Sequence, residues 1–312
     1  MPVTSDAARR LADNIQRVFL GNKDAVSRVV VCLLARGHLL IEDVPGVGKT
    51  VLAHALARSV RATFSRIQCT PDLLPSDITG ALVWDRNREA FDFRRGPVFA
   101  NIVLADEVNR TTPRTQSALL EAMGEGTVSV DGTMHTLPRP FMVVATQNPY
   151  EFEGTYFLPE NQLDRFLMRL SLGYPSPDDE RRVIENQPAR VALPALEAVV
   201  STDEILQLQQ QVDEVRIEAS LVDYIVAIAA ATREHDELQV GLSPRGALAL
   251  AQAARATAFL EGRDYVVPDD IVTNVIAVCA HRVVPRTSVE GSEFESGRRV
   301  MMGIIESTAG PV

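Results

Sequence analysis

The segment 39–50 has the residue types and spacing that bind the phosphates of a nucleotide. An apolar run leads into a loop that ends in Gly48-Lys49-Thr50, and a helical pattern follows. Backbone N–H groups at the start of that helix can converge on phosphate oxygens, because small residues let the main chain approach closely. Lys49 would meet the β- and γ-phosphates, and the Thr50 hydroxyl would bind Mg²⁺. The residues expected to bind ATP are Asp43, Val44, Pro45, Gly46, Val47, Gly48, Lys49, Thr50 and Val51.

Asp43 departs from the general phosphate-loop pattern Gly-x-x-x-x-Gly-Lys-Thr, because it stands where that pattern has its first glycine. If the backbone at this position needs a positive φ, a residue other than glycine costs about 1–2 kcal/mol, although Asp is among the better tolerated types. The alternative interpretation of the segment is an ordinary glycine-rich turn between a strand and a helix.

A second apolar run, Ile102–Asp106, ends in an acidic pair, Asp106-Glu107. Asp106 can hold the water shell of Mg²⁺, and Glu107 can act as the general base that polarises the attacking water. The alternative is that both carboxylates only end a strand in solvent. Beside the Lys49 loop, the pair favours an ATPase, because repeated hydrolysis requires a base.

Asn148 follows a further apolar run, Val143-Val144-Ala145-Thr146-Gln147. The carboxyl ends of parallel strands line one crevice, so Asn148 could orient the attacking water between Glu107 and the γ-phosphate. Taken alone, Asn148 is better explained as half of an Asn-Pro turn.

The elements that must position these residues alternate between strands and helices. Runs of strand length cover residues 38–42, 64–68, 102–106, 141–146 and 166–172, with helical segments such as 50–59 and 113–123 between them. The alternation predicts an α/β fold with a five-stranded parallel sheet covered by helices. Residues 81–99 and 126–137 interrupt it and resemble inserted β-hairpins, the second with an Asp131-Gly132 turn.

Beyond about Pro175 only helical patterns are expected, over residues 178–185, 202–212, 221–234, 245–260 and 269–281. The proline-containing stretch 187–194 is the expected linker. We therefore predict a core domain with N-terminal helices over residues 1–187 and a helical domain over residues 188–312.

Composition excludes several classes of protein. No apolar run approaches the roughly 18 residues that span a bilayer, so an integral membrane protein is excluded. The formal net charge of −10 makes nucleic acid an unlikely general partner. An N-terminus without an apolar signal segment and three scattered cysteines indicate the cytoplasm.

These motifs together resemble the AAA+ ATPases and, within them, the MoxR family. Residues 43–50 resemble Walker A, residues 102–107 Walker B, and Asn148 sensor 1. The closer similarity rests on longer strings that cover the first domain densely, namely residues 70–80, 105–110, 116–123, 145–149 and 154–166. Besides Asp43, the departures are Phe157 where proline is usual and Gly124 where an acidic residue is common.

The resemblance implies further roles. It assigns Arg165 as the arginine finger that reaches the γ-phosphate of a neighbouring subunit, although a local salt bridge to Asp164 or Glu160 is the alternative. It assigns Arg245 as sensor 2, at the start of a helix after a Ser-Pro signal, although a plain first-turn residue would look the same. The two hairpins would face the pore of a ring, by resemblance a hexamer, or be plain surface hairpins.

Family resemblance also implies partners with a von Willebrand factor A domain and a chaperone role in the maturation or activation of client proteins. Two alternatives remain open. One is a nucleic-acid-stimulated motor that uses Arg86, Arg88, Arg94 and Arg95 of the first hairpin. The other is a slow nucleotide-dependent scaffold whose phosphate loop is weakened by Asp43.

Overall fold

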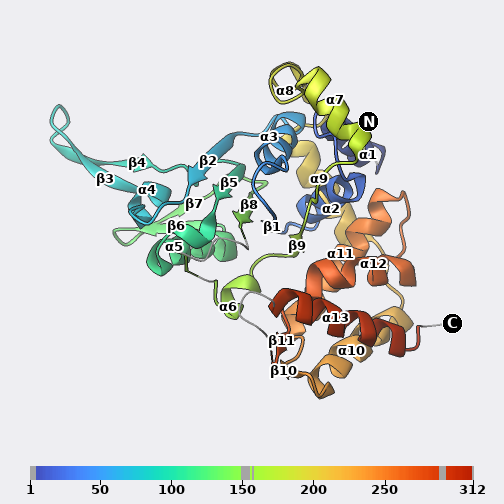
Figure 1. Ribbon diagram of the computed structural model, residues 1–312. Helices are drawn as coiled ribbons and strands as arrows, with labels where there is room; N and C mark the ends of the chain where they lie inside the picture. Colours follow the sequence, from blue (N-terminus) through green and yellow to red (C-terminus); the bar gives the residue numbers. More distant parts are fainter. Residues whose placement is uncertain (1–4, 149–154, 157, 288–292, 311–312) are drawn as a thin grey trace.

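A five-stranded parallel sheet forms the centre of the first part of the chain (Figure 1). The computed structural model describes residues 5–148, 155–156, 158–287 and 293–310. All pairings within the sheet are parallel, so the predicted parallel sheet is confirmed. Its strands, in spatial order, are β2 (Phe64–Gln68), β5 (Ile102–Asp106), β8 (Met142–Gln147), β1 (Leu39–Glu42) and β9 (Met168–Leu170).

Some predicted features fall outside the described residues. They are Pro149 after β8, Gly154 and Phe157 in the string 154–166, and part of the tail after Pro285.

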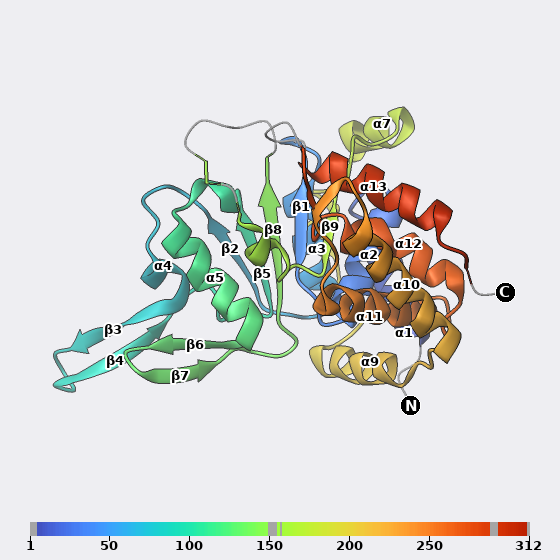
Figure 2. The same cartoon turned by 90° about the horizontal axis from the view of Figure 1, so that it is seen from below.

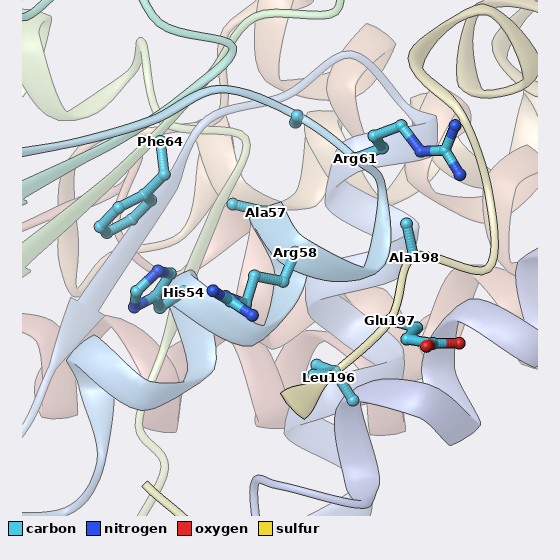
Figure 3. Close-up of a pocket in the computed structure, with 9 residues that line it drawn as sticks. His54, Ala57, Arg58, Arg61, Phe64, Leu196, Glu197 and Ala198 are labelled. Carbon is cyan, nitrogen blue, oxygen red and sulfur yellow. The ribbon is translucent and has the colours of Figure 1, made fainter. Parts of the chain in front are cut away.

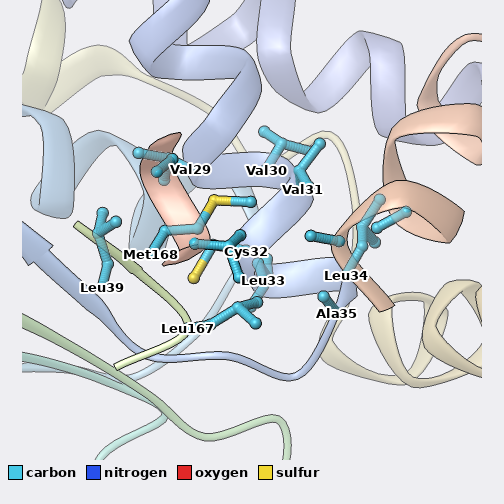
Figure 4. Close-up of a cluster of buried hydrophobic side chains, with 14 of the residues drawn as sticks. Val29, Val30, Val31, Cys32, Leu33, Leu34, Ala35, Leu39, Leu167 and Met168 are labelled. Carbon is cyan, nitrogen blue, oxygen red and sulfur yellow. The ribbon is translucent and has the colours of Figure 1, made fainter. Parts of the chain in front are cut away.

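Alternate residues of the strands supply two apolar cores, one on each face of the sheet. Leu39 and Ile41 pack into one core with α1 (Ser5–Gln16), α2 (Lys23–Leu34) and α3 (Lys49–Ser59). The residue between them, Leu40, packs into the other core with α4 (Pro75–Thr79) and α5 (Pro113–Glu125). Figure 4 shows the first core, where residues 29–34 of α2 and the following Ala35 lie beside Leu39, Leu167 and Met168. Burial on both faces explains why the strands are continuously apolar.

The two predicted hairpins are present as β3 (Gly80–Asp85) with β4 (Ala90–Arg95) and β6 (Thr127–Val130) with β7 (Thr133–Thr136). Figures 1 and 2 both show β3 and β4 projecting from the body, on the side away from the C-terminal helices. The rings of Phe93 and His135 stack with centroids 3.9 Å apart, so the hairpins contact each other. Short helices η1 (Val108–Arg110) and α6 (Glu160–Leu163) complete the core.

The C-terminal part is helical, as predicted, with additions that the periodicity did not reveal. Its helices are α7 (Pro177–Asn186), α8 (Ala192–Ala195), α9 (Thr202–Glu214), α10 (Ala219–Glu234), α11 (Pro244–Leu260), α12 (Pro268–Cys279) and α13 (Glu293–Ser307). The expectation that strands stop near Pro175 misses an antiparallel pair, β10 (Leu238–Val240) with β11 (Val284–Pro285). Helix α8 lies inside the expected linker. The boundary at residue 187 stays a prediction.

Helix α13 was not predicted, because the segment contains Ser and Gly and its apolar stripe is short. Val300, Met301 and Ile304 are nevertheless buried in the first core. A Cβ at Gly297 would lie 2.6 Å from the carbonyl oxygen of Ala280, so the absence of a side chain lets α13 pack closely against the end of α12. Within the described residues, none of the helices combines the length and apolar character needed to cross a bilayer.

His38 connects the sheet to α5 inside the core. Its Nδ1 accepts from the backbone N–H of Val143 at 3.0 Å, so Nε2 carries the proton and donates to the Met123 carbonyl oxygen at 3.0 Å. Burial lowers the pKa of His38 from 6.5 to about 4. The neutral imidazole is therefore the form that the folded protein holds.

Acidification below pH 6.5 should lower the free energy of unfolding, because His38 takes up a proton in the unfolded chain well before it does so in the folded one. This residue alone should account for a loss of about 2 kcal/mol between pH 7 and pH 5. Urea unfolding at both pH values, with His38→Gln compared with the parent, measures that share. His235→Gln, at the half-buried end of α10, is the control. Equal pH dependence in parent and His38→Gln would contradict the assignment.

Candidate functional site

The predicted phosphate loop joins β1 to α3, between Glu42 and Lys49. Gly46 and Gly48 have φ of 89° and 92°, a backbone conformation that favours glycine. Lys49 Nζ donates to the carbonyl oxygen of Asp43 at 2.7 Å, so the lysine folds back over the loop. Thr50 lies half-buried in the first turn of α3. The strand, loop and helix that phosphate binding requires are all present.

Asp43 does not strain this loop. Its backbone is not in the positive-φ region, so the expected cost of about 1–2 kcal/mol does not arise. Its carboxylate accepts hydrogen bonds from the Ser171 hydroxyl and from the backbone N–H groups of Val44, Leu172 and Gly173, at 2.7–2.9 Å. Because Asp43 takes the Leu172 N–H, β9 ends at Leu170, short of the predicted residue 172.

The acidic pair lies at the carboxyl end of β5, where the hydroxyl of Thr146 joins its two members. Thr146 Oγ1 donates to Asp106 Oδ1 at 2.8 Å and accepts from the backbone N–H of Glu107 at 2.9 Å. Thr146 is fully buried on β8. Sequence analysis did not single it out; its place two residues before Asn148 at a predicted strand end was the available signal.

Glu107 adopts a left-handed backbone conformation, with φ 57° and ψ 52°. Such a conformation in a residue other than glycine costs roughly 1–2 kcal/mol, and residues held in this way concentrate at functional sites. The carboxylate receives hydrogen bonds from Arg110 at 3.2 Å and Gln68 at 3.4 Å. It is therefore oriented while staying partly exposed, as a general base must be to reach water.

Asp106 also has a cationic neighbour that the sequence did not indicate. Arg66, on β2, donates through Nε and Nη2 to Asp106 Oδ2, at 3.0 and 2.5 Å. Register explains the contact, because Arg66 pairs with Leu104 and Gln68 with Asp106 on the neighbouring strand. One carboxylate oxygen is thus held by Thr146 and the other by Arg66.

Asn148 follows β8, and β8 lies between β1 and β5 in the sheet. Its side chain is buried at 6% exposure. The topology therefore puts Asn148 between the strand that carries the phosphate loop and the strand that carries the acidic pair, as predicted.

Arg165 and Arg245 lie outside that set of strand ends: Arg165 follows Asp164 directly after α6, and Arg245 approaches Asp164 from α11. The Arg165 guanidinium donates to the carbonyl oxygen of Leu120 at 2.5 Å. A Cβ at Gly124 would lie 2.6 Å from Arg165 Nη1, so the missing side chain makes room for it. The local salt bridge considered for Arg165 is replaced by other partners of Asp164. Arg282 binds one oxygen at 2.8 Å, and Arg245 approaches the other at 3.7 Å.

Arg282 is the buried centre of the contacts around Asp164 and was not predicted. Its side chain, 3% exposed, also donates to the carbonyl oxygens of Phe166, Leu167 and Val278. Arg245, in the first turn of α11 behind the Ser243 cap, is more than half exposed. The helical part thus binds the segment next to Arg165 through the buried Arg282. Another arginine of that part, Arg245, is exposed to solvent.

A cavity of about 370 Å³ adjoins the phosphate loop. It is lined mainly by apolar side chains and backbone, which suits a flat apolar ring better than a charged group. Four of its residues, Gly46, Val47, Gly48 and Val51, were predicted to bind the cofactor; the others were missed, because they come from separate segments. Those others are Val18, Phe19, Leu20, Gly21, Asn22, Leu172, Gly173, Pro175, Val183, Gln187, Pro188, Ala189 and Arg190.

A more open hollow, of about 730 Å³, lies at the far end of α3 (Figure 3). His54 stacks on Phe64 there, with ring centroids 4.6 Å apart. Figure 3 shows Arg58 extending toward His54, whereas Arg61 lies apart from that pair, near Ala198. None of the predicted site residues lines this hollow. The cavity beside the phosphate loop is therefore the one that fits the predicted chemistry.

Comparisons with known proteins agree with this geometry. A family model described as ATPase family associated with various cellular activities matches residues 38–168, and an AAA lid domain model matches residues 230–300. Chaperone MoxR1 of Mycobacterium tuberculosis is 45% identical over 86% of this chain and 74% of its own length. The chain belongs to the MoxR family of AAA+ ATPases.

Two further similar proteins match nearly the whole chain. An uncharacterised protein of Bacillus subtilis, YeaC, is 48% identical over 95% of this chain and 93% of its own. The crystal structure of a candidate ATPase from Cytophaga hutchinsonii has a TM-score of 0.90 at 36% identity, covering 99% of this chain and 96% of that one. The expected AAA+ fold with a helical lid is confirmed.

Thr146→Val should slow ATP turnover of this MoxR-family protein by about tenfold or more, because the isosteric change removes the hydroxyl that orients both acidic residues. ATP affinity should change by less than about threefold, since Thr146 is placed on the hydrolytic side. Thr146→Ser, which keeps the hydroxyl, is the matched control. Steady-state turnover and equilibrium ATP binding separate an effect on hydrolysis from an effect on affinity. Turnover in Thr146→Val equal to that of the parent would contradict the role assigned to the hydroxyl.

Gly48→Ala should weaken ATP binding by about tenfold or more, because a side chain is strained at φ 92° and its Cβ would lie 3.2 Å from the Phe19 ring. Gly303→Ala in α13, where an added Cβ meets nothing within 4 Å, should bind ATP like the parent. Titration with a fluorescent ATP analogue measures both variants. Unchanged affinity in Gly48→Ala would show that the loop does not hold the phosphates.

Proposed function

We propose that this MoxR-family protein hydrolyses ATP in an oligomeric ring and couples hydrolysis to remodelling, maturation or activation of partner proteins. The observation that carries the proposal is the division of the site residues into two groups. Lys49, Thr50, Asp106, Glu107 and Asn148 lie at or shortly after the carboxyl ends of adjacent strands, whereas Arg165 donates to the Leu120 carbonyl oxygen on α5 and Arg245 lies beside Asp164. A complete site then needs residues from two subunits.

In this proposal, ATP lies along the phosphate loop. Gly46–Lys49 N–H groups and Lys49 hold the phosphates, and the adjoining cavity of about 370 Å³ takes the adenine ring. Glu107 is the general base, held by Arg110 and by the Thr146 contact of its backbone. Asn148 positions the attacking water between the phosphate loop and the acidic pair.

The oxygen atoms of Thr50 and Asp106 fit a bound Mg²⁺. The Thr50 hydroxyl and the Asp106 carboxylate are oxygen ligands of the kind Mg²⁺ takes, with phosphate and water supplying the rest. The described residues hold no cluster of three or more protein ligands, which agrees with a metal that needs the nucleotide to complete its shell. Bound there, the ion would neutralise charge on the phosphates.

Arg165 serves the neighbouring subunit's ATP as an arginine finger, and Arg245 acts as sensor 2. Arg165 contacts α5 through Leu120, and Arg245 is more than half exposed beside Asp164. Arg245 is therefore accessible to solvent, and Arg165 is half-buried against α5. A hexameric ring of such subunits, with residues 1–187 as core and 188–312 as lid, is the arrangement we propose.

The client contacts are assigned to the two hairpins. Trp84 and Phe91 on β3 and β4 and Met134 on β7 are large apolar side chains exposed by 49%, 65% and 71%. Exposed apolar groups on a projecting hairpin suit a protein partner. By family resemblance the partners carry a von Willebrand factor A domain, and the name of the Mycobacterium relative, a chaperone, agrees with such a role.

The compartment we propose is the cytoplasm, where the three buried free cysteines would stay reduced. The nucleic-acid motor remains testable, since Arg86, Arg88, Arg94 and Arg95 are exposed. Salt-sensitive stimulation by DNA would be its signature. The scaffold alternative assumed that Asp43 weakens the phosphate loop. The backbone of Asp43 is not in the positive-φ region, so this argument for a scaffold is not supported.

Mixing two inactive variants tests the shared site. Glu107→Gln and Arg165→Ala should each lose about a thousandfold in ATP turnover. Their mixture should recover part of the activity, because an Arg165→Ala subunit keeps its own Glu107 and receives Arg165 from a Glu107→Gln neighbour. Specific activity of the parent should rise with protein concentration.

Arg298→Ala, an exposed arginine of α13, is the control and should behave like the parent. A mixture as inactive as its components, together with parent turnover that is independent of concentration, would contradict a site shared between subunits. Unimpaired turnover in Arg165→Ala would contradict the finger itself.

A further inference from the structure

Asp43 carries a buried carboxylate that the proposed chemistry does not use. It is 8% exposed. Oδ1 accepts from the backbone N–H of Val44 in its own loop, and Oδ2 accepts from Ser171, Leu172 and Gly173 after β9. The charge is therefore balanced by hydrogen bonds from two chain segments that are 128 or more residues apart in sequence.

The partners of Oδ2 form a small anion-binding concavity. Leu172 and Gly173 present successive N–H groups, at 2.7 and 2.8 Å from the same oxygen, and Gly173 has φ 68°. Successive N–H groups in such a turn favour an anion. Here the anion is a side chain of the phosphate loop, so the contact joins the loop to the segment that leaves the sheet toward α7.

The same two residues line the cavity beside the phosphate loop. Leu172 and Gly173 form part of its wall, and Gly46, Val47 and Gly48 form another part. Asp43 itself does not line the cavity, although it joins the two parts of the wall. The distance between the phosphate-binding and apolar parts of the site is thus set through one carboxylate.

We propose that Asp43 is a positioning residue that holds the wall of the apolar cavity in register with the phosphate loop, so that the site binds a nucleoside triphosphate through base and phosphates together. This inference rests on the proposed function. It replaces the view of Asp43 as a tolerated substitute for glycine. Because Lys49 Nζ donates to the backbone carbonyl oxygen of Asp43, changing the side chain leaves that contact possible.

The decisive comparison uses two ligands, ATP and inorganic tripolyphosphate, with the full-length protein. Asp43→Gly restores the general phosphate-loop residue and removes the carboxylate. ATP affinity should fall by about tenfold, because the cavity wall is no longer aligned, whereas tripolyphosphate affinity should change by less than about twofold. The measured quantity is the ratio of the affinities for ATP and tripolyphosphate. A general loss of stability would lower both affinities and leave this ratio unchanged.

Ser171→Ala is the milder variant, since it removes one hydroxyl donor and leaves both N–H groups. It should weaken ATP binding by about threefold, again with tripolyphosphate unchanged. Asp270→Asn is the matched control, because Asp270 is also a buried carboxylate that accepts a backbone N–H and an arginine, but in α12 of the helical part. It should leave the ratio of the two affinities as in the parent.

Equal or tighter ATP binding by Asp43→Gly would overturn the inference, and so would a parallel fall in both affinities, which would place Asp43 in phosphate binding. If Asp43→Gly does not fold, Ser171→Ala decides, and an unchanged ratio there counts against the inference. A parent that binds no ATP would overturn the proposed function as well. A parent that binds and hydrolyses ATP keeps the two questions separate.

Discussion

Parallel pairing of β5, β8 and β1 is the constraint on which the candidate site depends. Each strand is buried on both faces, so its apolar residues set its register, and its polar residues are confined to the carboxyl end. The three strands belong to segments far apart in sequence, yet their ends must share one edge of the sheet. A phosphate loop, an acidic pair and a polar amide become neighbours for that reason alone.

Several polar groups at this edge are buried, although Glu107 and the phosphate loop stay partly exposed, and the buried groups must satisfy one another. Asp43, Asp106, Thr146 and Asn148 are all buried. A buried polar group without a partner costs about 1–3 kcal/mol. The bonds of Thr146 to the acidic pair, of Arg66 to Asp106, and of Asp43 to residues 171–173 meet this requirement. Groups held in this way are already oriented before any ligand arrives.

The helical part contributes through Asp164. Arg282, buried in the interface, binds the carboxylate and several carbonyl oxygens of the segment that carries Arg165. A buried ion pair of this kind is costly to break, because either partner would be left uncompensated. The backbone next to the proposed finger is therefore held by the helical part, so the packing of the lid affects where that segment lies.

The sequence by itself determined the five strands of the parallel sheet, the longer helices from α9 to α12, both hairpins and the positions of the phosphate loop and acidic pair after their strands. These follow from local periodicity and from glycine, proline and charge at fixed spacings, all of which act over a few residues. Tertiary structure alone decided the roles of Thr146, Arg66 and Arg282, the packing of α13, and the partners of Asp43 and Arg165. Each of those depends on contacts between distant segments, and such contacts leave no periodic trace in a single sequence.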